Sequence, residues 1–383
     1  MINRLSPCPT DSFFLLGPRG TGKSTLLKSW FPDALWFDLL DQGELYRLLR
    51  SPGAFAQAVE SQPRNRWIVV DEIQKAPALL DEVHRLIEKD GRRFALSGSS
   101  ARKLRRGAAN LLAGRAFMHH LFPLTHFELS KNASLNAYLE FGGLPKIALE
   151  TVPSMKIERL RAYVGTYLAE EIKAEAVSRN VDRFSRFLQV SALANGQVTN
   201  LSNIARDSGM SRSTVSTHFS ILEDTLIGAF LPAWQPRLRI KEMGHPKFYF
   251  FDTGVFRELT DRGGESPTSE ERGVLLETAV FHELRAAQEY QRKSGVLSYW
   301  RTHEGVEVDF VWTKGEKIVA VEVKSSDTWK STFGKGLHSL KSTSKTPVTC
   351  LGVYTGPRRL KLPFGFVYPF AEFSALLHSG KLF

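Results

Sequence analysis

Eight residues near the start of the chain have the types and spacing of a phosphate-binding loop. Gly17-Pro18-Arg19-Gly20-Thr21-Gly22-Lys23-Ser24 fits the pattern G-x-x-x-x-G-K-[ST]. It follows the apolar run Phe13–Leu16 and precedes a helix-like stretch that begins at Thr25. Glycines let backbone N–H groups curl around phosphate, and the start of a helix adds partial positive charge. We therefore expect all nine residues from Gly17 to Thr25 to bind ATP, with Lys23 at the β- and γ-phosphates and Ser24 on Mg²⁺.

Two carboxylates follow a second buried run at the distance that such a loop requires. Trp67–Val70 is apolar and is followed directly by Asp71 and Glu72. We expect Asp71 to hold Mg²⁺ through water. Glu72 is the candidate catalytic base, which orients or activates the attacking water.

Hydroxyls and basic side chains come next. The run Phe94–Leu96 ends in Ser97 and Ser99, either of which can sense the γ-phosphate or hold the water; a simple turn is an equally open interpretation. One arginine of the next segment could stabilise the transition state, in cis or from a neighbouring subunit of a homo-oligomer, although a solvated basic face is the alternative. The basic residues concerned are Arg102, Lys103, Arg105, Arg106 and Arg115.

A helix-turn-helix pattern occupies residues 201–219. Ala205 permits close helix crossing, Gly209 takes the turn, Ser211 caps the second helix and Val215 packs it inward. The face predicted to be exposed carries residue types that suit phosphate and base edges, so it is a candidate DNA-binding face. It consists of Arg212, Ser213, Ser216, Thr217 and His218. A purely structural joint is the alternative.

A further candidate site consists of Asp309, Glu322 and Lys324, which lie on two strand-like runs joined by a short turn. Side chains alternate along a strand, so Glu322 and Lys324 share a face, and Asp309 on the neighbouring strand can meet them. Two carboxylates can bind Mg²⁺ or Mn²⁺, and a lysine can orient or deprotonate a water. Catalytic cleavage and simple binding of nucleic acid are both open to this set.

The elements that position these residues fall into three regions. In residues 1–130, short apolar runs alternate with helical stretches, which predicts an α/β domain with a parallel sheet of the P-loop NTPase type. Residues 131–265 are mostly helical by pattern. Residues 266–383 begin with a helix over Gly273–Gln291, and strand-like runs follow, which predicts a second α/β domain.

Several segments together resemble a large prokaryotic family in which an AAA+-like ATPase is fused to a C-terminal domain known as DUF4143. The similarity is carried by Phe14–Ser24, Asp71–Lys75, Leu96–Ser100, Ala113–Arg115, Phe122–Leu124, Phe141–Pro145, Tyr167–Ile172, Leu222–Leu226 and Tyr249–Gly254. The resemblance covers nearly the whole chain. It implies a cytoplasmic P-loop ATPase, a winged-helix segment in the middle and a nuclease-like fold at the end.

The C-terminal triplet separately resembles the PD-(D/E)XK nuclease superfamily. Asp309, Glu322 and Lys324 match its Asp…Glu-x-Lys pattern, although no proline precedes Asp309. Glu277, on the helix before the strands, matches the extra acid found in some members, such as the Holliday junction resolvases. The resemblance therefore implies an outer or auxiliary place for Glu277 at a metal held by Asp309 and Glu322.

Charge favours an anionic partner. The 383 residues include 51 Lys and Arg against 40 Asp and Glu, a net charge of +11. Gly91–His120 holds seven basic residues and no acid, and the part from Val323 to the end holds nine basic residues against two acids. Stretches of this kind are typical of faces that bind anions, most often nucleic acid, although a generic surface charge is the alternative.

Cysteine usage and hydropathy exclude other classes. Two cysteines, Cys8 and Cys350, cannot make a disulfide scaffold or a cysteine-rich zinc site. The first residues lack the apolar segment of a signal peptide, and no apolar run could span a membrane. We therefore expect a cytoplasmic protein that binds and hydrolyses ATP with Mg²⁺ and acts on DNA. The alternative is a nucleotide-switched binding or signalling protein with an inactive nuclease fold.

Overall fold

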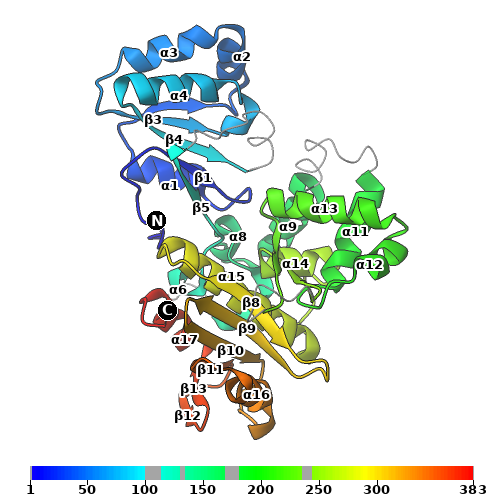
Figure 1. Ribbon diagram of the computed structural model, residues 1–383. Helices are drawn as coiled ribbons and strands as arrows, with labels where there is room; N and C mark the ends of the chain where they lie inside the picture. Colours follow the sequence, from blue (N-terminus) through cyan, green and yellow to red (C-terminus); the bar gives the residue numbers. More distant parts are fainter. Residues whose placement is uncertain (1, 100–113, 130–133, 169–180, 235–243, 383) are drawn as a thin grey trace. The chain divides into compact units, whose positions relative to one another are not determined.

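The computed structural model describes residues 2–99, 114–129, 134–168, 181–234 and 244–382, which belong to two compact units (Figure 1). The smaller unit consists of residues 4–122 and 221–227, and the larger of residues 1–3, 123–220 and 228–383. Arg102, Lys103, Arg105 and Arg106 lie outside the described residues, as does most of Tyr167–Ile172. Among the helices that are described, none has the length and apolar character needed to cross a membrane.

The smaller unit is built on a five-stranded parallel sheet in the order β2-β3-β4-β1-β5. The strands are β1 (Phe13–Leu16), β2 (Leu35–Asp38), β3 (Trp67–Asp71), β4 (Arg93–Gly98) and β5 (Phe117–His120). The helices are α1 (Lys23–Trp30), α2 (Gln42–Arg50), α3 (Pro52–Glu60) and α4 (Leu79–Asp90), with a 3₁₀ turn at Ile73–Lys75. The expected parallel sheet of a P-loop NTPase is confirmed, and β5 is a strand that the apolar runs did not indicate.

The sheet is covered on both faces, as the uninterrupted apolar strands require. Alternation places Phe14 and Leu16 of β1 on one face, where they join a core with residues from α2, α3 and α4. These three helices lie together on one side of the strands in Figure 1. Phe13 points to the other face and makes ring contacts with Trp30 and Phe31 at the end of α1. The helix that follows the phosphate loop is thereby fixed against the strand that precedes the loop.

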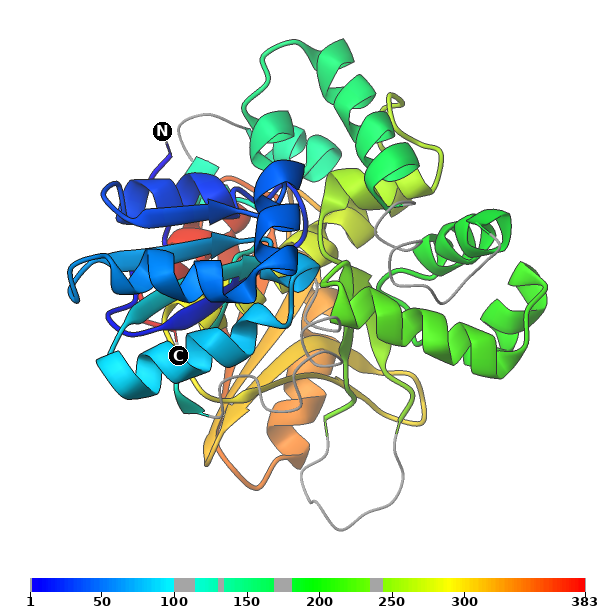
Figure 2. The same ribbon diagram turned by 90° about the horizontal axis from the view of Figure 1, so that it is seen from above.

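The larger unit begins with helices. They are α6 (His126–Leu129), α7 (Leu135–Phe141), α8 (Pro145–Ala148), α9 (Pro153–Ala162), a π-helical segment (Tyr163–Leu168), α11 (Val181–Leu193), α12 (Leu201–Ser208) and α13 (Arg212–Asp224). The last residues of α13, 221–224, belong to the smaller unit. An antiparallel pair follows, β6 (Gly228–Leu231) with β7 (Lys247–Phe250), and then α14 (Thr253–Leu259). Two helices joined by a tight turn and followed by an antiparallel ribbon have the order of a winged helix (Figure 2).

The end of the larger unit is a six-stranded mixed sheet in the order β12-β13-β11-β10-β9-β8. Helix α15 (Ser269–Tyr290) precedes β8 (Val296–Arg301), β9 (Glu307–Lys314) and β10 (Lys317–Lys324). Helix α16 (Lys335–Thr343) then leads to β11 (Val348–Tyr354), β12 (Leu360–Leu362), β13 (Gly365–Pro369) and α17 (Phe370–His378). The expected helix and the strands β8 to β11 are confirmed, whereas β12 and β13 add to the sequence-based prediction.

Candidate functional sites

The phosphate loop has the backbone that its glycines allow. Gly20 and Gly22 have φ values of 84° and 92°, in the left-handed region that side chains disfavour. A Cβ on Gly17 would lie 2.3 Å from the carbonyl oxygen of Leu121, so only glycine fits between β1 and the end of β5. Helix α1 begins at Lys23, directly after Gly22. The amino end of α1 therefore faces the loop, as an anion site requires.

Lys23 and Ser24 lie where their predicted roles need them. The Lys23 ammonium is buried and donates to the carbonyl oxygens of Gly17 and Pro18, at 2.8 and 3.2 Å. Ser24 and Ser97 both donate hydroxyl hydrogen bonds to Asp71, the last residue of β3. Burial raises the pKa of the Asp71 carboxyl, and the two hydroxyls oppose the shift. A hydroxyl and a carboxylate in contact at the end of the sheet are a donor set that suits Mg²⁺.

Glu72 is held in a constrained position beside Asp71. Its φ of 61° is left-handed, a conformation that costs a non-glycine residue on the order of 1–3 kcal/mol. Its backbone N–H donates to the Ser97 hydroxyl at 3.2 Å, and its carboxylate accepts a hydrogen bond from the amide of Gln74. The same amide donates to Ser99 at 3.1 Å. The structure therefore joins Glu72 to Ser97 directly and to Ser99 through Gln74, a buried glutamine that the sequence analysis missed.

Two arginines of the smaller unit, Arg4 and Arg115, differ in their position relative to the phosphate loop. Arg4 donates to the carbonyl oxygens of Thr21 and Phe122, at 2.9 and 2.6 Å, and so links the phosphate loop to the segment that follows β5. Arg115 forms an ion pair with Glu88 and precedes the amino end of β5. Because all five strands are parallel, that end lies across the sheet from the phosphate loop. Arg115 is therefore not placed to act on a nucleotide in cis, and a role in a neighbouring subunit stays a prediction.

The helix-turn-helix has the packing expected of it, with one correction. Gly209 has a φ of 70° at the turn, Ser211 accepts from the N–H of Thr214 at 3.1 Å, and Val215 is fully buried. The prediction that His218 is exposed is wrong, because its ring is only 2% exposed and packs against Phe184 and Phe187. Burial also lowers its pKa. The other residues of the predicted face are exposed: Arg212, Ser213, Ser216 and Thr217.

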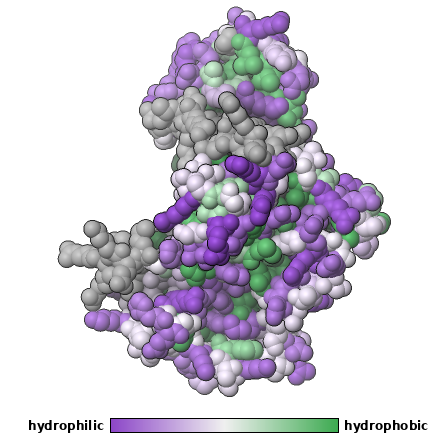
Figure 3. All heavy atoms as spheres, turned by 90° about the vertical axis from the view of Figure 1, so that its right-hand side faces the viewer, coloured by the Kyte–Doolittle hydropathy of each residue, from purple (hydrophilic) through white to green (hydrophobic). Residues whose placement is uncertain are grey.

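The side of the larger unit that carries these helices is turned to the viewer in Figure 3. Hydrophilic residues dominate this surface, with hydrophobic residues in smaller patches between them. Such a surface is compatible with a polar, charged ligand.

In the C-terminal sheet, strands β9 and β10 separate at Asp309 and Glu322. Their antiparallel pairing ends at Phe310 with Val321, one step before Asp309 and Glu322 would pair. A β-bulge in β9 lies at the same place, because Ser298 of β8 pairs with Val311 and Trp300 with Val308. Bulges bend a strand and change the direction of its side chains. Instead of a backbone pair, Asp309 Oδ2 accepts the N–H of Val323 at 2.7 Å.

The expected triplet comes together at this separation. Lys324 Nζ lies 2.5 Å from Glu322 Oε1 and 3.9 Å from Asp309 Oδ2. Asp309 and Glu322 are 8% and 6% exposed, and Glu322 Oε2 is buried with no hydrogen-bond partner among the described residues. Burial, and then the charge of Asp309, raise the pKa of Glu322 well above its ordinary value. The Lys324 ammonium offsets part of this repulsion.

Glu277 lies near the triplet but has other partners. Its carboxylate accepts from Lys247 at 3.0 Å and from the Tyr249 hydroxyl at 2.5 Å, both on β7. Lys247 also lies 2.5 Å from Glu307. Burial, and then the charge of Asp309, raise the pKa of Glu277 to about 7, although Lys247 opposes the shift. Lys247 is a member of this cluster that the sequence analysis missed.

The side chains of this cluster can be compared with the ligands that a divalent metal ion requires. Across the described parts of the chain, no three His, Cys, Asp or Glu side chains are grouped to hold a metal ion. Asp309 and Glu322 alone nevertheless suit Mg²⁺, which is commonly bound by one or two carboxylates with water and phosphate oxygens as the remaining ligands. The Oε2 of Glu322, which has no hydrogen-bond partner in the part of the chain that the structure describes, is the donor atom that such an ion needs.

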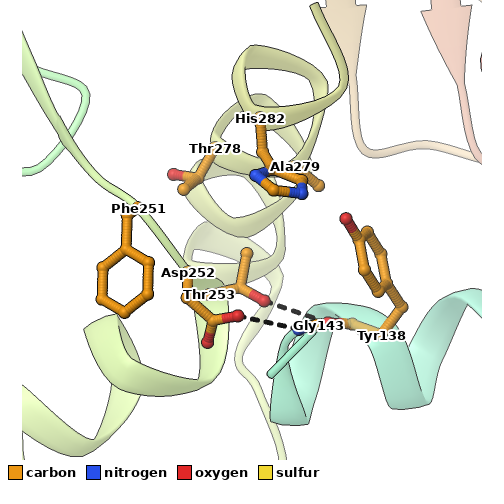
Figure 4. Close-up of a pocket in the computed structure, with 8 residues that line it drawn as sticks. All are labelled: Tyr138, Gly143, Phe251, Asp252, Thr253, Thr278, Ala279 and His282. Atoms are coloured by element: carbon orange, nitrogen blue, oxygen red, sulfur yellow. Dashed lines mark hydrogen bonds between the residues drawn. The ribbon is translucent and has the colours of Figure 1, made fainter. Parts of the chain in front are cut away.

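Two further segments that carried the family resemblance form one joint around Asp252 (Figure 4). Its carboxylate accepts the N–H groups of Gly143 and Val255, at 2.7 and 3.0 Å. A Cβ on Gly142 would lie 2.0 Å from Asp252 Oδ1, which explains the glycine. Burial raises the pKa of Asp252 to about 6 against the effect of these N–H groups.

Figure 4 shows the same carboxylate at the edge of a small pocket between α7, α14 and α15. The pocket is lined by Tyr138, Gly143, Phe251, Asp252, Thr253, Thr278, Ala279 and His282. Two hydrogen bonds lie within the lining, from the N–H of Gly143 to Asp252 and from the Thr253 hydroxyl to the carbonyl oxygen of Tyr138 at 2.9 Å. The Thr278 hydroxyl accepts a further hydrogen bond from Asn195, outside the pocket. We therefore assign this joint a structural role.

Comparison with known families agrees with the geometry of the smaller unit. A family model described as an AAA domain matches residues 10–130, and one described as domain of unknown function DUF4143 matches residues 272–373. The chain combines an AAA domain with a DUF4143 domain. Between them, residues 132–266 match another domain of unknown function, DUF8612. The AAA domain supports nucleotide binding and hydrolysis as the activity of the smaller unit.

Whole-chain relatives exist among curated proteins. An uncharacterized protein of Methanocaldococcus jannaschii is 21% identical over 377 residues, covering 89% of this chain and 82% of the relative. An uncharacterized protein of Haemophilus influenzae is 24% identical over 335 residues, covering 80% of each chain. Both alignments therefore extend along most of this chain and most of each relative.

Solved structures give weaker matches. The ADP form of the Aeropyrum pernix ORC2 protein matches 66% of this chain and 87% of its own, with 14% identity and a TM-score of 0.32. The Bacillus subtilis DNA clamp loader delta protein matches 55% of this chain and 83% of its own, with 13% identity and a TM-score of 0.25. The family matches, and not these low scores, are the basis for the assignment.

Proposed function

We propose that this AAA–DUF4143 protein hydrolyses ATP and acts on DNA, with the C-terminal site binding a divalent cation. In the AAA domain, Lys23 binds the phosphates, Ser24 and Asp71 hold Mg²⁺, and Glu72 takes the proton of the attacking water. Bound Mg²⁺ would neutralise charge on the phosphates. Ser97 and Gln74 position the carboxylates of Asp71 and Glu72 through the hydrogen bonds described above.

The observation that carries the DNA part is the buried cluster of Asp309, Glu322 and Lys324. Burying two carboxylates this close together is costly unless a cation offsets their repulsion. Lys324 does so only in part, because Glu322 Oε2 has no partner in the described residues. A divalent cation on Asp309 and Glu322 would satisfy that oxygen and could bind a DNA phosphate. Lys324, 31% exposed, is then free to orient a water.

The second candidate is a nucleotide-switched binding protein whose C-terminal domain does not cut. The ion pairs of Lys324 with both acids favour it, because a lysine that neutralises the carboxylates can replace a metal. In that case the domain binds its partner by shape and charge, and the ATPase controls the binding.

The experiment that separates these functions is cleavage of plasmid, single-stranded and branched DNA with Mg²⁺ or Mn²⁺. We expect wild-type protein to cut at least one substrate, and Asp309→Asn and Lys324→Ala to lose cleavage while retaining ATP hydrolysis. Lys317→Ala, which changes an exposed lysine at the other end of the strand that carries Lys324, is the matched control and should cut normally. Cleavage that Asp309→Asn leaves unchanged would reject the nuclease assignment, and DNA binding without cleavage would support the second candidate.

A further inference from the structure

Lys247 makes an arrangement with the carboxylates of the C-terminal domain that the nuclease-like triplet does not account for. It is the first residue of β7, the second strand of the ribbon that follows the helix-turn-helix. Its ammonium is 4% exposed and lies between two carboxylates, 3.0 Å from Glu277 and 2.5 Å from Glu307. The ring of Tyr299 lies 5.5 Å from the same nitrogen. Two acids and an aromatic face are the surroundings of a firmly held cation.

The carboxylates of this domain therefore surround two lysines that differ in exposure. Lys324, beside Asp309 and Glu322, is 31% exposed and leaves an oxygen of Glu322 without a partner among the described residues. Lys247, between Glu277 and Glu307, is buried. Burial lowers the pKa of its ammonium, but the charges of Glu277, Asp309 and Glu307 outweigh burial and raise that pKa above the ordinary value. These carboxylates thus favour the charged form of Lys247, and its ammonium fills the space between Glu277 and Glu307.

We propose that the Lys247 ammonium takes the place of a second metal ion in the C-terminal site. It occupies the position between Glu277 and Glu307 and so limits the site to one divalent ion. That ion binds at Asp309 and Glu322, so this inference rests on the proposed function. Glu277 then serves to position the lysine and does not ligate the metal. The lysine also ties the ribbon of the winged helix to the metal-binding sheet by a charge contact.

The test is the number of Mn²⁺ ions bound per chain, measured by calorimetry and by electron paramagnetic resonance of free Mn²⁺. Full-length Asp71→Asn protein without nucleotide is used as the parent, so that the AAA domain does not contribute. We expect one ion per chain, which is lost in the additional variant Asp309→Asn. With Lys247→Met, the freed carboxylates should admit a second ion, whereas Lys247→Arg should keep the number at one.

The outcomes separate the inference from the function on which it rests. No bound Mn²⁺ in the parent would reject the metal site itself. Two ions in the parent, or one ion in a folded Lys247→Met variant, would reject the role of Lys247 and leave the metal site intact.

Should Lys247→Met fail to fold, Glu277→Gln decides the question, because glutamine has the same shape without the charge. Neutralising a group that supports a metal ligand costs about 10–100-fold in metal affinity. If Glu277 serves only the lysine, Glu277→Gln should keep one ion per chain, and its affinity should fall by less than about tenfold. A larger loss of affinity would make Glu277 part of the metal site and overturn the proposal.

Discussion

Gln74 shows how much of the ATP site depends on a residue without a chemical signature of its own. Its buried amide donates to Glu72 and to Ser99, and its Oε1 has no hydrogen-bond partner within the described residues. A Cβ on Gly98 would lie 2.7 Å from that oxygen, so the glycine leaves room for the amide. Together with the left-handed backbone of Glu72, this amide fixes the direction of the carboxylate.

Gln74→Ala should therefore lower kcat for ATP hydrolysis while leaving nucleotide affinity nearly unchanged. Misplacing a catalytic group by about 1 Å can cost about 100-fold in rate, and we expect a loss of about 10–100-fold. Steady-state hydrolysis and nucleotide-binding titrations measure the two effects. Gln57→Ala, an exposed position on α3, is the control and should behave as wild type. A kcat equal to that of wild type would show that Glu72 is oriented without Gln74.

Lys23 and Glu72 should separate binding from turnover. Lys23→Ala is expected to abolish ATP binding, because the ammonium that meets the phosphates is gone. Glu72→Gln is expected to bind ATP with near wild-type affinity and to lose hydrolysis, since an amide cannot accept the proton of water. Equilibrium binding of a fluorescent ATP analogue and phosphate release report the two steps. Full hydrolysis by both variants would contradict the assignment of the site.

The sequence predicted those residues of the ATP site that lie within short local patterns. Lys23, Ser24 and Asp71 follow from spacing and from the apolar run before each. Gln74 and Arg4 could not be predicted in this way, because their partners are set by how separate strands and turns meet. Lys247 was missed for the same reason: its two carboxylates lie 30 and 60 positions away in the sequence.

At the scale of elements, the buried carboxylate of Glu283 connects α15 to α6 and α17. It accepts from the backbone N–H of His126 at 2.6 Å and from Ser374 and His378 of α17, both at 2.7 Å. Burial would raise its pKa, but the hydrogen bond and charge of His378, the charge of His282 and the hydrogen bond of Ser374 together outweigh burial and lower the pKa to about 2. Helices α6, α15 and α17 are therefore held together by an ionised group.

This carboxylate should contribute to the pH dependence of stability. Its folded pKa lies below the ordinary value of 4.5, so the unfolded chain takes up its proton first as the pH falls. The contribution of Glu283 is complete above about pH 4.5 and is lost as the pH falls towards 2. Glu283→Gln should cost about 3–5 kcal/mol at pH 7 and reduce the loss of stability between pH 5 and 3.

Urea unfolding followed by circular dichroism, at pH 7, 5 and 3, measures this effect. Glu270→Gln, at an exposed position of the same helix, is the control and should change neither the stability nor its pH dependence. An unchanged acid response in Glu283→Gln would contradict the assigned role of the carboxylate.

The second helix of the helix-turn-helix should contribute phosphate contacts. Removing one contact lowers the slope of log affinity against log salt by about 0.9 on duplex DNA. Arg212→Ala is expected to weaken DNA binding and reduce the slope by about this amount. Arg85→Ala, on α4 of the AAA domain, is the control. Identical salt slopes for the two variants would assign the helix a structural role alone.

Some elements could not be predicted from their sequence because their patterns are mixed. Strand β5, Phe117-Met118-His119-His120, ends in two histidines, and only its pairing with β1 makes it a strand. His218 was placed on the wrong face, although its position three residues after Val215 puts both on one side of the helix. Its chemical type suggested a DNA contact, but in the structure the spacing decides, and the ring fills the core beside Phe187.

At the scale of the whole molecule, the net charge of +11 remains the most general pointer to DNA. All the basic residues from Val323 onward except Lys381 lie in the DUF4143 domain, which also holds the carboxylate cluster. Part of the basic stretch Gly91–His120 lies outside the described residues, so its geometry plays no part in the proposal. DNA binding driven by phosphates must depend on salt, because neutralising phosphates releases counterions.

The proposal that this ATPase acts on DNA is tested most directly by measuring the DNA affinity of the full-length protein at a series of salt concentrations. Fluorescence anisotropy with a labelled duplex, between about 50 and 200 mM salt, covers the range in which phosphate contacts change affinity steeply. We expect binding at low salt and a linear fall of log affinity with log salt. With several phosphates neutralised, the slope should be about −3 or steeper. Absence of binding at low salt, or affinity that does not change with salt, would contradict DNA as the partner.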